Sequence, residues 1–315
     1  MRVAVTGAGG RLGRALVSAL EGAPFTGLAG PIAWTRAEFD LDAPDGIGPL
    51  LDRDRPELVV HAAAWTDVDG CARDPELALA RNGAATETLA RACAARGLDL
   101  IVVSTNEVFD GRRTDGRGYA PDDPTNSINP YGASKLAGER AATEAYGRAE
   151  SQGGLGALGI VRTAWLFGPP GNDFPGKILA AAERARDAGE PLRLVADEVG
   201  SPTYSRDLAE GIAELIGNGA IGGIHHVVNG GAASRAEWGR EVLRQAALLL
   251  PKAGLDVATE DVPASTWPRA STPPAWAVLE PTPLPGGEPL RPWQAALADY
   301  LPALVRDRAR AAAAR

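Results

Sequence analysis

The chain has 315 residues, of which 45% are hydrophobic and 23% are charged, and these values exclude a disordered chain, a collagen and a coiled-coil rod. The net charge of −8 argues against binding to nucleic acid or to an anionic membrane surface. Two cysteines, Cys71 and Cys93, exclude a disulfide scaffold, and no apolar run approaches the roughly 18 residues of a membrane span. The first residues, MRVAVTGAGG, lack the apolar core of a signal peptide, so we expect a cytoplasmic protein.

The first 168 residues alternate short apolar runs with helical patterns. Leu12, Leu16 and Leu20 lie on one helical face, and Asn129 and Pro130 are a favourable cap and first residue for a later helix. This alternation predicts an α/β fold of the Rossmann type, with a doubly wound parallel sheet. The expected strands cover residues 2–5, 31–34, 58–63, 98–103 and 158–162, and the expected helices cover residues 11–21, 75–96 and 130–146.

After residue 168, helices are separated by short strands and irregular loops, and residues 263–292 are rich in proline and mostly extended. We therefore expect two domains and a frayed tail. The dinucleotide-binding domain with the catalytic residues covers 1–168, the smaller α/β lobe, mainly for substrate, covers 169–305, and the tail covers 306–315. Helices are expected in the second lobe at 178–188, 207–217 and 236–250.

A glycine-rich turn follows the first expected strand. Gly7, Gly10 and Gly13 in TGAGGRLG fit the pattern GxxGxxG and open an amphipathic helix. Small residues allow the tight turn from strand to helix, and the N–H groups of the helix N-terminus can approach a pyrophosphate. The alternative is an ordinary glycine turn, but the position after the first strand favours a dinucleotide site.

The end of the second expected strand bears on the choice between NAD and NADP. An NAD site usually has an acidic residue there for the ribose 2′-hydroxyl, whereas this chain has Thr35 and Arg36. An arginine can pair with a 2′-phosphate, which favours NADPH, with NADH still possible; the alternative is a solvated surface arginine. Asp40, Leu41 and Asp42 follow and are candidates for contacts near the adenine.

Tyr131 and Lys135 form the spacing YxxxK in the expected helix at 130–146. Residues four apart lie on one helical face, so the ammonium and the helix N-terminus are expected to bring the phenol pKa down toward neutrality. Such a tyrosine can protonate a carbonyl oxygen while hydride arrives at the carbon. The alternative is an exposed helix pair with no chemical role.

Polar and small residues follow two further expected strands. Ser104, Thr105 and Asn106 come directly after the strand at 98–103, at the sheet edge where ligands of this fold class bind. Their hydroxyls can hold a substrate carbonyl beside Tyr131. Small residues, including Ala63 and Ala64, end the strand at 58–63 and would let a nicotinamide ribose pack closely.

Taken together, these segments make the chain resemble the extended short-chain dehydrogenase/reductases and, more narrowly, the dTDP-4-dehydrorhamnose reductase family. The resemblance runs from about residue 1 to residue 300. It is carried by TGAGGRLG (6–13), VHAAAWTDVDGC (60–71), STNEVFDG (104–111), YGASKLAGE (131–139), RTAWLFGPPGNDF (162–174), DEVGSPTYSRDLAE (197–210) and the region 262–279.

The resemblance implies roles for particular residues. It implies a catalytic set of Thr105, Tyr131 and Lys135, and substrate contacts from Asn106 and Trp165. It implies NADP(H)-dependent reduction of the 4-keto group of a nucleotide-activated deoxysugar by a monomer or homodimer. The cofactor contacts that it implies are Gly10, Arg11, Leu12, Ala64 and Thr66.

Two departures from the family pattern concern the substrate. The family usually has Asp-Tyr where this chain has Asn106 and Glu107, so the shape of the first residue is kept but its charge is lost. An Arg-Pro near the C-terminal substrate loop is replaced by Pro273 and Pro274. These changes bear on the identity of the sugar rather than on the reaction.

We expect no metal ion. Some reductases of the family are described as dimers joined through magnesium held by glutamates, one of them in the first helix. Here the matching place is Ala15, with Arg14 beside it, and neither offers the oxygen ligand that magnesium needs.

Two other functions remain open on the sequence. One is a related sugar epimerase, dehydratase or ketoreductase of secondary metabolism, although a dehydratase usually has an Asp-Glu pair after the threonine and Asn106-Glu107 supplies only half of it. The other is a non-catalytic NADP-binding regulator that resembles the regulatory subunit of methionine adenosyltransferase.

Overall fold

The main sheet of the protein is parallel throughout. The computed structural model describes residues 1–251 and 254–313. Six strands lie in the order β10-β5-β4-β3-β1-β2, and every neighbouring pair is parallel. The strand order reverses between β1 and β3, and such a point is where α/β folds bind ligands. The strands are β1 (Val3–Thr6), β2 (Ile32–Trp34), β3 (Leu58–His61), β4 (Asp99–Thr105), β5 (Leu158–Thr163) and β10 (Gly223–His226).

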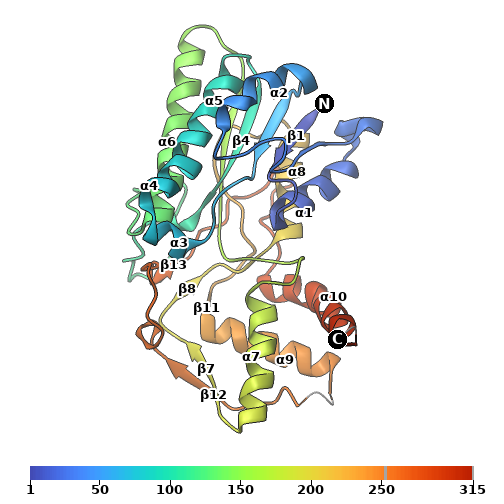
Figure 1. Cartoon of the computed structure of the whole chain (residues 1–315), viewed down its shortest axis with the longest axis vertical. Helices are drawn as coiled ribbons and strands as arrows, with labels where there is room; N and C mark the ends of the chain where they lie inside the picture. The colour runs from blue at the N-terminus through green and yellow to red at the C-terminus, as the bar shows by residue number, and fades with distance from the viewer. Residues whose placement is uncertain (252–253, 314–315) are drawn as a thin grey trace.

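Helices cover both faces of this sheet, which confirms the expected doubly wound α/β fold (Figure 1). Alternate strand residues point to opposite faces, so Val3 and Val5 pack against α1 and α8, whereas Ala4 and Val59 pack toward α2, α5 and α6. Both clusters are buried, as expected for strands that are apolar along their whole length. The helices are α1 (Arg11–Glu21), α2 (Ile47–Asp54), α5 (Ala85–Ala94), α6 (Pro130–Ser151) and α8 (Ser205–Gly217).

The second lobe lies below the main sheet in Figure 1 and has its own core. Phe167, Trp238 and Tyr300 are fully buried there among three helices and short strand pairs. The helices are α7 (Phe174–Ala188), α9 (Arg235–Leu249) and α10 (Trp293–Ala313). The strands are β6 (Leu166–Phe167), β7 (Leu192–Val195), β8 (Val199–Gly200), β9 (Thr203–Tyr204), β11 (Ala233–Ser234), β12 (Thr259–Val262) and β13 (Trp276–Ala277).

Two expected elements differ in the structure. The single helix expected at 75–96 is α4 (Pro75–Ala78), a wider π turn η3 (Leu79–Ala84) and then α5. The tail expected to fray from residue 306 instead continues α10 as far as Ala313, because Arg308 forms an ion pair of 2.7 Å with Glu183 of α7. Residues 314–315 lie outside the described residues.

The two lobes share elements. Helix α8 packs on α1 and β10 pairs with β5, although both come after residue 168 in the chain. The proline-rich residues 263–292 are mostly extended, as expected, with only the short η5 (Ala264–Thr266) and β13 as regular elements.

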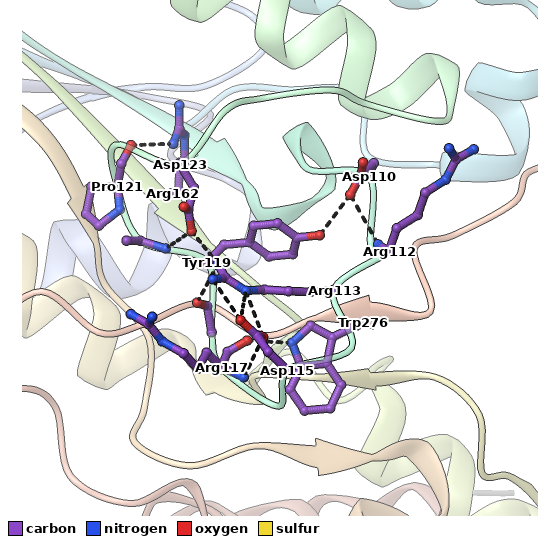
Figure 2. Close-up of polar contacts among 12 residues, drawn as sticks. Asp110, Arg112, Arg113, Asp115, Arg117, Tyr119, Pro121, Asp123, Arg162 and Trp276 are labelled. Atoms are coloured by element: carbon purple, nitrogen blue, oxygen red, sulfur yellow. Dashed lines mark hydrogen bonds and ion pairs between the residues drawn. The ribbon is translucent and has the colours of Figure 1, made fainter.

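A loop between β4 and α6 fastens the first lobe to the segment around β13 (Figure 2). Arg113 forms ion pairs with Asp115 at 3.0 Å and Asp123 at 2.5 Å, which close the loop on itself. The indole Nε1 of Trp276 donates to the Arg117 carbonyl at 2.8 Å. These contacts hold a long connection in one conformation next to the residues that follow β4.

Candidate active site

A cavity of about 410 Å³ lies at the carboxyl ends of β1, β3, β4 and β5. Thr105, Tyr131 and Lys135 line it together, although they come from β4 and α6. The glycine turn and Trp165 line it as well. The position is the one that the strand order predicts for a ligand site of a doubly wound sheet.

The glycine turn is built for close backbone approach. Gly7 has φ +66°, and a Cβ on it would lie 2.9 Å from the backbone of Ala63. A Cβ on Gly13 would lie 2.1 Å from the Gly7 carbonyl oxygen. Gly10 is the N-cap of α1 and makes no side-chain cap, and the first turn of α1 has no acidic residue. The turn therefore presents a helix N-terminus to an anion, as a pyrophosphate site requires.

A second cavity of about 300 Å³ continues from the first. The two share Gly7, Gly10, Ala62 and Ala64 in their linings, so they form one groove along the turn. The far end of the groove is lined by Arg36, and its length and its glycine wall fit an extended dinucleotide. The other expected cofactor residues in this second lining are Asp40, Leu41 and Ala63, and those in the first are Arg11, Leu12, Gly13 and Thr66.

Two arginines, rather than one, stand at the far end of the groove. Arg36 is 75% exposed in its side chain and pairs with Asp42 at 3.1 Å and Asp40 at 3.5 Å. Arg81 binds the same Asp42 at 2.5 Å, and this hydrogen bond holds the Asp42 pKa below its usual value. The sequence analysis missed Arg81 because it comes from η3, far from the second strand.

The helix that carries Tyr131 and Lys135 begins where the sequence predicts. The Asn129 side chain accepts a hydrogen bond from the Gly132 N–H at 2.8 Å, and Pro130 occupies the first position. The two reactive side chains therefore leave the first two turns of α6. Both project from one helical face into the cavity.

The expected lowering of the Tyr131 pKa is wrong for this structure. Burial raises the pKa of Tyr131, the carboxylate of Glu107 raises it further, and a hydrogen bond with Thr105 lowers it only in part. Burial also lowers the pKa of Lys135 to about 8, with Glu139 acting in the opposite direction. Removal from water is the largest cause for both groups, and it keeps the phenol protonated at neutral pH.

A buried polar layer behind the cavity holds its walls in register. Asn82 accepts from the Trp65 N–H at 2.8 Å and donates to the Trp65 carbonyl and to Ser134 Oγ, both at 3.0 Å. Ser134 belongs to α6, so Asn82 joins the loop after β3 to the catalytic helix. Asn82 lies in the π turn η3, a geometry that is frequent at functional sites. The sequence analysis missed it.

His61, at the end of β3, is fully buried in the same layer. Its Nδ1 lies 2.8 Å from Thr6 Oγ1 and its Nε2 lies 3.1 Å from Thr86 Oγ1. Because the Thr86 hydroxyl donates to the Asn82 carbonyl, it is left to accept from Nε2–H, and Nδ1 accepts from Thr6. Burial, with the charge of Lys135, lowers the His61 pKa to about 3 and keeps it neutral.

The resemblance implies a substrate contact for Asn106, but the protein itself forms hydrogen bonds with both ends of the Asn106 amide. The Asn106 amide is 2% exposed, donates to the Ala277 carbonyl at 2.9 Å and bonds with Thr105 Oγ1 at 3.2 Å. The protein therefore uses both ends of this amide, even though Asn106 belongs to the cavity lining. Glu107 lines the cavity too, and burial raises its pKa.

Trp165 forms the wall between this cavity and the second lobe. It has φ +42°, a rare value for a bulky residue, and its ring stacks with Trp238 at 5.8 Å. The guanidinium of Arg235 lies 3.5 Å from the centre of the Trp165 ring. A Cβ on Gly200 would lie 2.5 Å from the indole, so only glycine leaves room for it.

Behind Trp165, a cavity of about 370 Å³ lies in the second lobe. Arg235 and Arg269 pair with the buried Glu198, at 3.7 Å for Arg235. Four cationic side chains and two aromatic rings surround this space, which suits a ligand that has both a flat ring and negatively charged groups. Its lining includes Phe174, Lys177, Arg193, Glu198, Arg235, Trp267 and Arg269.

The structure therefore places every candidate residue of the sequence analysis on the continuous groove or its catalytic end. It adds Arg81, Glu107 and Arg235, and Asn82 behind the wall. No group of three or more metal-binding side chains occurs within residues 1–251 and 254–313. In the same ranges, no helix is both long and apolar enough to cross a bilayer.

The chain also matches known proteins over nearly its whole length. The family model described as RmlD substrate binding domain matches residues 1–306. A dTDP-4-dehydrorhamnose reductase of Streptomyces griseus is 36% identical over 95% of this chain and 93% of its own length. A dTDP-4-keto-6-deoxy-D-glucose reductase of Streptomyces niveus is 35% identical over 96% of this chain and 97% of its own.

Solved structures agree with these relatives. A dTDP-4-dehydrorhamnose reductase of Bacillus anthracis in complex with NADP superposes with a TM-score of 0.78 at 29% identity, over 95% of this chain and 98% of that one. The family match, the relatives and the shared architecture confirm the resemblance that the sequence motifs indicate. The chain belongs to the dTDP-4-dehydrorhamnose reductase family of extended short-chain dehydrogenase/reductases.

Proposed function

We propose that this protein is an NADPH-dependent reductase of the 4-keto group of a dTDP-linked 6-deoxy sugar, with dTDP-4-dehydrorhamnose as substrate and dTDP-L-rhamnose as product. The observation that supports this most is the meeting of Thr105, Tyr131 and Lys135 in one cavity that continues into the glycine groove. A proton donor and a dinucleotide groove side by side are what carbonyl reduction by hydride transfer needs.

The three catalytic residues divide the work. Bound NADPH supplies the hydride for the keto carbon. Tyr131 donates its proton to the keto oxygen, and its raised pKa means that this proton is present at neutral pH. The Thr105 hydroxyl, which donates to Asn106 Oδ1 in the free protein, would turn to donate to the same oxygen. The Lys135 ammonium, with a pKa of about 8, stabilises the negative charge left on the phenol.

Arg36 and Arg81 support NADPH over NADH. Both line the far end of the groove, and a 2′-phosphate there would replace the carboxylate of Asp42 as their partner. The Asp42 carboxylate lies between the two arginines, so this position already accommodates one negatively charged group. The groups that hold the cofactor are then Gly7 and Gly10 at the pyrophosphate and these arginines at the adenosine end.

The second-lobe cavity supports a nucleotide diphosphate as the activating group of the sugar. Arg235, Arg269 and Lys177 bring positive charge for phosphates, and Phe174 and Trp267 offer rings for a base. Trp165 then stands between the nucleotide and the reacting sugar. The relative of Streptomyces niveus is named for a different substrate, dTDP-4-keto-6-deoxy-D-glucose. The identity of the product, including its configuration at C4, therefore has to be measured.

The same proposal includes a cytoplasmic location, where NADPH and nucleotide sugars are made, and a monomer or homodimer.

The deciding assay is NADPH oxidation with dTDP-4-keto-6-deoxy sugars, with NMR identification of the product. We expect turnover that falls by about 100-fold or more in Tyr131→Phe, with NADPH affinity retained. A variant as active as the parent would contradict the role of Tyr131. NADPH binding with no turnover of any sugar would favour the regulatory alternative.

A further inference from the structure

Backbone contacts fix the position of Glu107, which lines the catalytic cavity. Its N–H donates to Thr105 Oγ1 at 3.2 Å. Its carbonyl oxygen packs on the first turn of α6, where a Cβ on Gly132 would lie 2.0 Å away. Glu107, Thr105 and Tyr131 all line one cavity. A ligand oxygen that faces Thr105 and Tyr131 therefore has Glu107 beside it.

The described residues donate a hydrogen bond to only one of the two carboxylate oxygens of Glu107. Among the described residues, its one hydrogen bond comes from Asn129 Nδ2, which donates to Oε2 at 2.6 Å. Burial raises the pKa of Glu107, against the influence of Asn129, Arg235 and Arg269. Water that reaches Oε1 in the free protein would be displaced by a ligand, and the oxygen would then need a donor from that ligand. Oε1 is thus an acceptor that a bound molecule can satisfy.

A sugar hydroxyl is the donor that fits this acceptor. In a 4-keto sugar, the hydroxyl on the neighbouring C3 lies close to the keto oxygen, which Thr105 and Tyr131 face. We infer that Glu107 accepts a hydrogen bond from this hydroxyl, so that Glu107 selects 3-hydroxy sugars over 3-deoxy sugars. This inference rests on the proposed function and assigns a specificity-determining residue to it.

Neighbouring groups argue against other partners. A sugar ammonium would face the positive charges of Arg235 and Arg269, both of which already influence Glu107. Asn106 is a weaker acceptor for the same task, because its amide is uncharged and its Nδ2 donates to the Ala277 carbonyl. The carboxylate of Glu107, the next residue along the chain, is therefore the group that remains to recognise the sugar hydroxyl.

The test compares dTDP-4-dehydrorhamnose with its 3-deoxy counterpart by kcat/KM in the parent, Glu107→Gln and Glu107→Leu. Gln keeps the size, the Asn129 contact and a neutral hydrogen bond, whereas Leu keeps only the volume. We expect the parent to prefer the 3-hydroxy sugar by about 100-fold or more, since a site built for a hydroxyl rejects the analogue that lacks it. The preference should fall to about tenfold in Gln and to near equality in Leu.

Glu183→Gln is the matched control, because Glu183 pairs with Arg308 and belongs to neither cavity lining of the groove. It should keep the parent preference. NADPH affinity reports whether the cavity is intact, and the Gln variant decides alone if the Leu variant fails to fold. An active parent whose preference is weak, or is unchanged in Glu107→Gln, overturns the inference and leaves the proposed function standing. A parent that reduces neither sugar overturns both.

Discussion

Tyr131 and Lys135 depart from their ordinary pKa values in opposite directions, and burial is the main cause for both. Burial disfavours the charged form of each group, so the phenol is kept neutral and the ammonium is made easier to deprotonate. The free enzyme therefore holds a proton on Tyr131 that it can give away.

The Lys135 pKa of about 8 predicts a pH limit for activity. Lys135 loses its charge as the pH rises through this value, so kcat/KM for NADPH should fall about tenfold per pH unit above about pH 8. A pH profile of kcat/KM measures this. Lys135→Arg keeps its positive charge as the pH rises, so its kcat/KM should lack this fall, the alkaline limb of the profile. A limb that stays at the same pH in Lys135→Arg would assign it to another group.

The two arginines of the groove predict a selective loss of cofactor affinity. Arg36→Ala and Arg81→Ala should each weaken NADPH binding by about 1.5 kcal/mol and barely change NADH binding, because a charge-assisted hydrogen bond to phosphate is lost. Fluorescence titration with both cofactors measures the effect. Arg53→Ala is the control, since Arg53 pairs with Asp54 and lies outside both linings. Equal losses for NADPH and NADH would show that the arginines act only on the fold.

Among the elements, helix α6 and the short η4 (Asn106–Val108) set the geometry of the cavity together. Their backbones touch at Gly132, which has no room for a side chain against the Glu107 carbonyl. Arg162 of β5 and Glu139 of α6 form a buried ion pair at 2.8 Å that fixes the same helix from the other side. Breaking such a pair leaves an unpaired buried charge, so α6 has little freedom to move.

Gly132→Ala tests the contact between α6 and η4. The new Cβ would force these two elements apart, so we expect a fall in kcat of at least about tenfold and a lower unfolding temperature. Gly147→Ala in the same helix is the control, because a Cβ there meets nothing within 4 Å. It should stabilise the protein by up to about 1 kcal/mol. Parallel losses in both variants would contradict the role assigned to the contact at Gly132.

Sequence patterns predict these elements well where the signal is local. The glycine turn, the Asn129 cap and the YxxxK spacing each lie within a few residues, and the structure has α1 and the start of α6 where they are expected. Arg81 and Asn82 lie on a π turn, and helical periodicity cannot reveal its extra residue per turn. Arg235 reaches Trp165 from a distant helix, and Glu107 owes its importance to burial, which spacing does not report.

Across the whole molecule, two buried histidines make the fold sensitive to acid. Burial lowers the pKa of His61 to about 3 and that of His226 to about 4, whereas an unfolded chain protonates both near pH 6.5. The unfolded state therefore binds more protons below pH 6.5, so stability is lost as the pH falls from 6.5 toward 4. Both ring nitrogens of His226 lack a hydrogen-bond partner among the described residues.

We expect each histidine to contribute roughly 1 kcal/mol of destabilisation per pH unit in this range. Urea unfolding at pH 7, 6 and 5 measures the slope. His226→Leu removes one titrating group, so its slope should be shallower than that of the parent. Identical slopes would show that other groups cause the acid sensitivity.

The pairing of β10 with β5, and of α8 with α1, has a consequence for engineering and for recombination between relatives. A chimera that joins the first 168 residues to the second lobe of another reductase would import a foreign strand and helix into the first sheet. The unit that can be exchanged is therefore the second lobe without α8 and β10. A crossover that ignores this would set a mismatched strand against β5 and a mismatched helix against α1, so apolar surface at both places would be incompletely covered and the product would aggregate.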